Sequence, residues 1–152
     1  MGCACGAPAH TLRDRSSSAA GVPMPYVHIV IGLALVQFLF FAVAVAGART
    51  RYKVAAPAVT GNETFERYLR VQMNTLEQLV VFIPSILLCG QYWSPYVAAA
   101  LGVVFLIGRL VYFFTYVKDP KSRELGFILT VGPNAILLVG AIVGSARAAL
   151  SY

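Results

Sequence analysis

Four long apolar runs dominate this chain and leave few folds open to it. They occupy about residues 27–48, 69–92, 95–116 and 125–150. Each run is long enough to cross the hydrocarbon core of a bilayer as a helix, which takes about 20 residues. The runs are continuously apolar, whereas strands of a membrane barrel alternate between lipid-facing and lumen-facing residues. The sequence therefore predicts an all-α integral membrane protein, built as a bundle of four transmembrane helices.

The overall composition supports a bilayer as the surroundings of this chain. Hydrophobic residues make up 59% of it and charged residues 12%, which is about half the charged share of an ordinary soluble domain. The net charge of +6 is not a sign of nucleic-acid binding, because the charges lie in short segments between the spans and no soluble binding fold accompanies them.

The first 23 residues differ in kind from the rest. They are rich in Ala, Gly and Ser and show no hydrophobic period, so a disordered tail is expected at 1–23 and a membrane domain at 24–152. The tail lacks the apolar core of a signal peptide, and Met24 is an alternative start. Cys3 and Cys5 have no second cysteine pair or histidine cluster to complete a metal site, so no metal is expected.

Basic side chains gather in two of the three connections between the spans. The first holds Arg49, Arg51, Lys53, Arg67 and Arg70, and the second holds Lys118, Lys121 and Arg123. The turn near residues 92–95 holds none. Because basic residues concentrate on the cytoplasmic side, loops 49–70 and 117–124 are expected to face the cytoplasm. The membrane would be the inner membrane in a bacterium or the endoplasmic reticulum in a eukaryote.

The second span begins with a polar stripe. Arg70, Asn74 and Glu77 are spaced i, i+4 and i+7, so they lie on one side of a helix. Ionisable residues inside a span are costly and usually functional. The structural alternative is that Arg70 and Glu77 pair with neighbouring helices and hold the bundle together. The chemical variety of the stripe favours a binding site.

The third span carries a second stripe, formed by Arg109, Tyr112 and Tyr116. It ends at the same mouth where the first stripe begins, so the two stripes are expected to meet. Arg109 should lie roughly 10 Å inside the helix end and face the bundle, with Glu77 as a candidate partner. For Tyr116, the alternative is an anchor at the membrane interface, and for Arg123 it is ordinary cytoplasmic positive charge.

These motifs together resemble the superfamily of membrane-associated proteins in eicosanoid and glutathione metabolism, known as MAPEG. The resemblance is greatest to the subgroup that contains leukotriene C4 synthase and the type 2 and type 3 microsomal glutathione transferases. It covers about residues 27–150 and aligns without a gap from Arg49 to Arg123. The residues that carry it are Phe65, Glu66, Arg67, Arg70, Gln72, Asn74, Glu77, Arg109, Leu110, Tyr112, Phe113, Tyr116 and Arg123.

The resemblance implies a homotrimer that binds glutathione between subunits near the cytoplasmic face. The ligand-binding residues that it implies in one subunit are Arg70, Asn74, Glu77, Tyr112 and Tyr116, and the neighbour would bring Arg49 and Gln72. Gln78, directly after Glu77, is also expected to bind the ligand. The chemistry is suitable, because arginine forms forked hydrogen bonds to carboxylates and a buried glutamate suits an ammonium group.

The resemblance also implies that Arg123 is the catalytic residue. It would stabilise the glutathione thiolate for attack on a hydrophobic electrophile, with no covalent enzyme intermediate, because the nucleophile belongs to the cosubstrate. The expected activity is that of a membrane glutathione transferase, with glutathione peroxidase activity on lipid hydroperoxides as an addition.

Two departures from the leukotriene synthase pattern narrow the expected activity. Thr50 stands where that enzyme has a second loop arginine, and Gln78 replaces a tyrosine, so leukotriene synthesis is not expected. One alternative is a non-catalytic lipid- or glutathione-binding member of the same family. The other is a four-span multidrug exporter, but that class expects a buried acid in the first span and residues 27–48 contain none.

Overall fold

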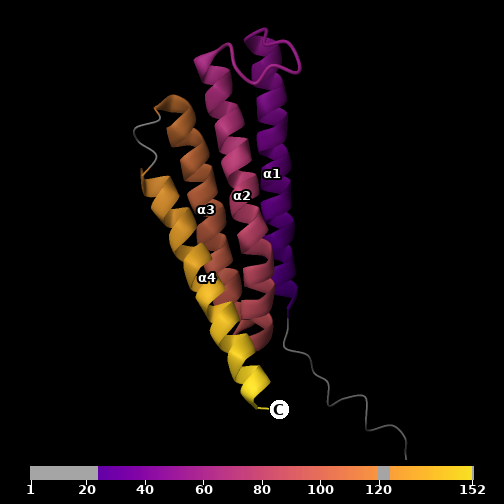
Figure 1. Cartoon of the computed structure of the whole chain (residues 1–152), viewed down its shortest axis with the longest axis vertical. Coiled ribbons are helices and arrows are strands. Elements are labelled where there is room, and N and C mark those ends of the chain that lie inside the picture. The colour runs from indigo at the N-terminus through magenta and orange to yellow at the C-terminus, as the bar shows by residue number, and fades with distance from the viewer. Residues whose placement is uncertain (1–23, 120–123, 152) are drawn as a thin grey trace, which may run out of the picture.

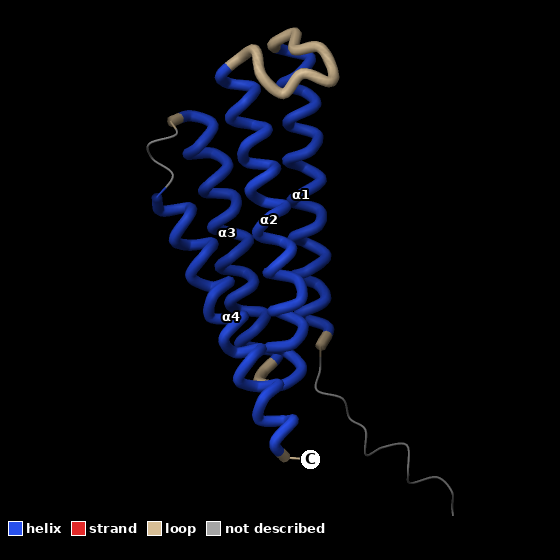
Figure 2. The backbone as a smooth tube through the Cα atoms, in the orientation of Figure 1, coloured by secondary structure: helices blue, strands red, loops and turns tan. Residues whose placement is uncertain are grey.

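The computed structural model describes residues 24–119 and 124–151. Within them the chain forms four helices and no strand (Figures 1 and 2). The helices are α1 (Pro25–Arg51), α2 (Glu63–Tyr92), α3 (Pro95–Lys118) and α4 (Glu124–Leu150). Each is long and apolar enough to cross a membrane, so the predicted four-span fold is confirmed. The tail expected at 1–23 and the catalytic residue expected at position 123 lie outside the described residues.

The helices lie side by side along the long axis of the molecule (Figure 1). α2 and α3 pack against each other, and both α1 and α4 pack against this pair. α1 and α4 therefore lie at opposite edges of the bundle. A loop over residues 52–62 joins α1 to α2 at one end, and a short turn through Trp93 and Ser94 joins α2 to α3 at the other.

Asn62 sets the start of α2. Its side-chain oxygen accepts hydrogen bonds from the backbone N–H groups of Thr64 and Phe65, at 3.0 and 3.1 Å, which satisfies donors that a helix start leaves without partners. α2 consequently begins at Glu63 and not at residue 69. Hydropathy marks only the apolar part of a helix, so its polar first two turns were assigned to the loop.

The two loops expected at 49–70 and 117–124 were therefore predicted too long. α1 continues to Arg51, so the first connection covers residues 52–62 and not 49–70. α3 continues to Lys118 and α4 already includes Glu124, so residues 117, 118 and 124 of the loop expected at 117–124 are helical. Several basic residues assigned to loops are thus helical and have fixed directions.

Aromatic rings fill the interior of the bundle. Phe82 of α2 stacks on Phe105 of α3 with ring centroids 4.0 Å apart, and Phe41 of α1 stacks on Phe113 of α3 at 4.7 Å. The outward faces are also apolar: Val43 is 71% exposed and Val80 is 68% exposed. Apolar side chains inside and outside suit a bundle surrounded by lipid, which is as apolar as the core itself.

Glycines bring α3 and α4 into close contact. A Cβ atom on Gly108 would lie 2.7 Å from the backbone oxygen of Leu129, and one on Gly126 would lie 2.6 Å from the Cα of Tyr112. Small residues allow this approach in membrane helices. The Leu129 carbonyl has no helical N–H donor four residues later, because residue 133 is proline.

We predict that Gly108→Ala destabilises the bundle by about 1 to 3 kcal/mol, because the added methyl group meets backbone that cannot rotate away. Gly132→Ala is the matched control, since a Cβ there meets nothing within 4 Å. Unfolding of both variants in detergent should show a lower midpoint for Gly108→Ala only. Equal midpoints would contradict the close helix contact.

Candidate functional site

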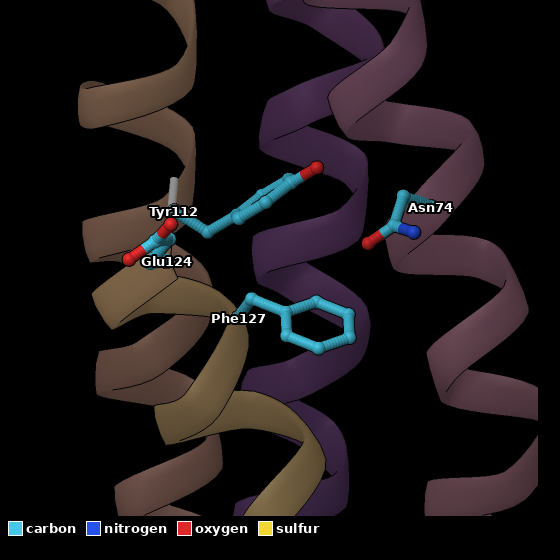
Figure 3. Close-up of a pocket in the computed structure, with 4 residues that line it drawn as sticks. All are labelled: Asn74, Tyr112, Glu124 and Phe127. Atoms are coloured by element: carbon cyan, nitrogen blue, oxygen red, sulfur yellow. The ribbon is translucent and has the colours of Figure 1, made fainter. Parts of the chain in front are cut away.

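A cavity of about 370 Å³ lies among α2, α3 and α4. Its described lining consists of Asn74 from α2, Tyr112 from α3, and Glu124 and Phe127 from α4. In Figure 3 the Tyr112 and Phe127 side chains extend toward Asn74, while Glu124 lies on the side away from it. The stripes of the second and third spans therefore meet at Asn74 and Tyr112.

Arg109 is the most unusual side chain beside this cavity. It belongs to α3, which is apolar and long enough to span a membrane, and it is only 1% exposed. A charged side chain is therefore buried inside the bundle. Its Nη1 donates to Asn74 Oδ1 at 3.0 Å, and its Nη2 donates to the Val71 carbonyl oxygen at 3.3 Å and to the Thr75 hydroxyl. Its Nε is buried without a hydrogen-bond partner in the described chain. Arg109 thus faces the bundle, as the sequence predicted.

The predicted pairing of Arg109 with Glu77 is wrong. Glu77 is exposed, and no ion pair joins these two residues in the described structure. The physical reason is the direction of each side chain on α2. Val71 and Thr75 are buried toward α3, Asn74 lies at the edge of that face, and Glu77 lies farther around the helix. Neutral oxygens therefore bind the guanidinium in place of a carboxylate.

Tyr112 occupies the centre of a short aromatic stack. The Arg109 guanidinium carbon lies 4.6 Å from the centre of the Tyr112 ring, and Tyr116 stacks on Tyr112 at 5.3 Å. A cation over an aromatic face is attracted by the ring quadrupole. The ring of Tyr112, which is 4% exposed, is therefore held in place at the edge of the cavity.

The other expected ligand-binding residues lie elsewhere on the described chain. Arg70 and Glu77 are exposed and Gln72 is half-buried, and the described chain offers Arg70 and Glu77 no hydrogen bond or ion pair. Arg49 folds onto its own loop, where its Nη1 lies 2.8 Å from the Ala58 carbonyl oxygen and its guanidinium lies over the Phe65 ring at 4.7 Å.

Gln78 contacts α4 within the span. Asn134 Nδ2 donates to Gln78 Oε1 at 3.0 Å, while Asn134 Oδ1 is buried and lacks a partner in the described chain. Arg67, one turn before the stripe, points toward the end of α3, where its Nη1 lies 3.4 Å from the carbonyl oxygens of Val117 and Lys118. α2 therefore makes polar contacts with α3 and α4 along much of its length.

The order of these features along the chain matches a known family. The MAPEG family matches residues 27–143, from the first turn of α1 to the last third of α4. The chain belongs to the MAPEG family. The resemblance inferred from the motifs is thereby confirmed.

Individual MAPEG relatives support this assignment. An uncharacterized protein of Synechocystis sp. is 49% identical over 96 residues, which cover 63% of this chain and 70% of that protein. Human microsomal glutathione S-transferase 2 is 43% identical over 96 residues, covering 62% of this chain and 65% of the relative. Leukotriene C4 synthase of Cavia porcellus is 32% identical over 111 residues, covering 68% and 74%. The chain thus spans about two thirds of these relatives.

Sequence reasoning missed two of the residues that line the cavity. Glu124 and Phe127 line it from the first turns of α4. Their i, i+3 spacing places them on one helix side, and Glu124 directly follows Arg123 in the chain. That adjacency was the available signal for a site residue. It is weak, because a single acid at a helix start is common and is stabilised there by the helix dipole in any case.

We predict that Gln78→Leu destabilises the bundle by about 0.6 to 1.7 kcal/mol, which are the average and the maximum found for hydrogen bonds between membrane helices by double-mutant cycles. The change leaves the Asn134 amide without its side-chain partner, whereas Gln78→Leu combined with Asn134→Leu removes both polar groups. The double variant should therefore lose less stability than the two single variants added together. A double-mutant cycle of unfolding in detergent measures this, and simple additivity would mean that the two amides do not interact.

Proposed function

We propose that this chain is a membrane glutathione transferase whose glutathione site includes the cavity between Asn74 and Tyr112. The observation that carries the proposal is the meeting of these two motif residues in one cavity, directly beside the buried cation of Arg109. Family membership and the 43% identity to human microsomal glutathione S-transferase 2 support the same activity.

The exposed charged residues of α2 suit the charges of glutathione. The peptide carries two carboxylates and one ammonium group. Arg70 can form forked hydrogen bonds to a carboxylate and Glu77 can accept from the ammonium group. Both side chains are exposed and unpaired in the described chain, which leaves them available to a ligand.

Arg123 is the proposed activating residue. It directly precedes Glu124, which lines the cavity. Its cation would stabilise the glutathione thiolate, which then attacks a hydrophobic electrophile and forms a carbon–sulfur bond while the leaving group departs with its electron pair. With a lipid hydroperoxide, two glutathione molecules would instead reduce the peroxide to an alcohol and water and form glutathione disulfide.

The assembly proposed for this activity is a homotrimer in which Arg49 and Gln72 complete the site of the neighbouring subunit. The exposed polar side of α2 supports an interface there, because Arg70 and Glu77 are otherwise costly next to lipid. The basic connections would face the cytoplasm, which is where glutathione is available and where positive loops are retained.

We predict that Arg123→Ala abolishes conjugation of glutathione to chlorodinitrobenzene while glutathione binding is retained, because the arginine stabilises the thiolate rather than the peptide. The purified protein in detergent is assayed for conjugation, for reduction of a lipid hydroperoxide and for glutathione binding. A wild-type protein that binds glutathione but turns over neither substrate would favour a non-catalytic binding protein. Unchanged conjugation by the variant would remove Arg123 from the mechanism.

A mixing experiment tests the shared site. Arg49→Ala and Arg70→Ala should each be poorly active alone, since every site then lacks one arginine. Co-expression of the two should restore about a quarter of the sites, because random closed trimers bring an intact Arg49 next to an intact Arg70 at some interfaces. The control is a mixture of the two variants, each purified as its own trimer, under conditions in which subunits do not exchange between trimers. No recovery after co-expression would contradict a site built from two subunits.

A further inference from the structure

The guanidinium of Arg109 is enclosed by a set of neutral groups, here called the Arg109 cluster. The cluster consists of Arg109 with the Asn74 amide, the Thr75 hydroxyl, the Val71 carbonyl and the Tyr112 ring. A charged side chain inside a membrane is expensive and tends to be functional. None of the groups that contact the guanidinium in the described chain is a carboxylate, so the cluster solvates the positive charge and does not neutralise it.

Two members of the cluster also line the cavity. Asn74 and Tyr112 belong both to the cavity wall and to the contacts of Arg109. Arg109 itself is not among the described lining residues. It is therefore placed to act on a ligand through its neighbours.

The hydrogen bond to Arg109 fixes which way the Asn74 amide faces. A guanidinium has only donors, so the atom of Asn74 that meets it must be the oxygen. In Figure 3 the Asn74 oxygen lies on the side nearer Tyr112 and Phe127, and the nitrogen lies on the opposite side of the amide. The two N–H donors thus point away from Tyr112 and Phe127. They remain for a part of the ligand that extends past the cavity along the side of α2 that also carries the exposed Arg70 and Glu77.

We infer that Arg109 is a positioning residue for the glutathione site and makes Asn74 a hydrogen-bond donor to the ligand. The Asn74 NH₂ group then donates to an acceptor of the peptide, either a carboxylate or an amide carbonyl oxygen. It does not bind the ammonium group. The Arg109 charge reinforces this choice, since it lies 3.0 Å from the Asn74 oxygen and favours negative charge nearby. The inference rests on the proposed function, because it names glutathione as the ligand.

The packing of Tyr112 against the guanidinium extends the same role to α3. Arg109 and Tyr112 are one turn apart on that helix, and their contact at 4.6 Å restrains the ring. In Figure 3 the Tyr112 hydroxyl is directed to the α2 side of the cavity. One buried cation therefore orients one wall residue from each of two helices.

The test is a double-mutant cycle of glutathione affinity with Arg109→Met, Asn74→Ala and the combined variant, measured by titration calorimetry on the full chain in lipid nanodiscs. Arg109→Met should weaken binding about 10- to 100-fold, which corresponds to the loss of one hydrogen bond to a charged group of the ligand. If Arg109 acts through Asn74, the combined variant should bind no more than about twofold worse than the weaker single variant. Arg109→Lys keeps the charge but loses the fork, so its affinity should fall between those of wild type and Arg109→Met.

Gln37→Leu is the matched control. It removes another hydrogen bond between helices, from Gln37 Nε2 to the Leu106 carbonyl at 3.0 Å, in a part of the bundle that does not line the cavity. Its glutathione affinity should equal that of wild type even if its thermal stability falls. Should Arg109→Met fail to fold, Thr75→Val replaces it, because it removes one acceptor of the guanidinium without removing the charge. Thr75→Val should then weaken binding severalfold.

Wild-type affinity in Arg109→Met, or in Thr75→Val if that variant has to be used, would overturn the inference. Losses that multiply in the combined variant would overturn it as well, because Arg109 would then act independently of Asn74. A wild-type protein that does not bind glutathione would overturn the proposed function together with this inference, whereas normal wild-type binding with unaffected variants would overturn the inference alone.

Discussion

The solvation of Arg109 inside the bundle is the constraint on which the site depends. Insertion of an arginine at the centre of a membrane helix costs about 2.5 to 3.5 kcal/mol, so the guanidinium must find partners within the protein. α2 offers three of them within one turn, the Val71 carbonyl, the Asn74 amide and the Thr75 hydroxyl. A shift of α3 by one helical turn, about 5.4 Å, would separate Arg109 from all three. The relative height of α2 and α3 is therefore tied to this cation.

The cavity also requires the close approach of α4. Gly126 lies against the Tyr112 backbone and Gly108 lies against the Leu129 carbonyl, so the first turns of α4 reach the level of Tyr112. Glu124 and Phe127 can then form the wall opposite Asn74. The contact between Gln78 and Asn134 ties α2 to the same helix farther along the span. Polar contacts and small residues together thus hold α4 at the site, since lipid provides no hydrophobic force between helices.

Helical spacing shows which residues share one side of a helix, but it does not show which neighbouring helix that side faces. This explains what the sequence predicted correctly at the site and what it did not. The i, i+4, i+7 pattern of Arg70, Asn74 and Glu77 was a sound reason to expect one polar side on α2. These three residues lie within about 60° of one another around the helix, but only Asn74, at one edge of this sector, contacts α3. Glu77 was paired with Arg109 because its charge was opposite, and charge carries no information about rotation of the helix. The role of Thr75 was missed because a threonine within an apolar run gives no distinct signal.

The sequence by itself determined the four spans and the motifs that identify the MAPEG family, because hydropathy and spacing are properties of short segments. Only the tertiary structure decided which oxygens bind Arg109 and which α4 residues wall the cavity. Those choices depend on how far each helix is rotated and how closely it approaches its neighbour. Rotation and approach are set by contacts such as Gly126 with Tyr112, between residues on different helices, and no local pattern records them.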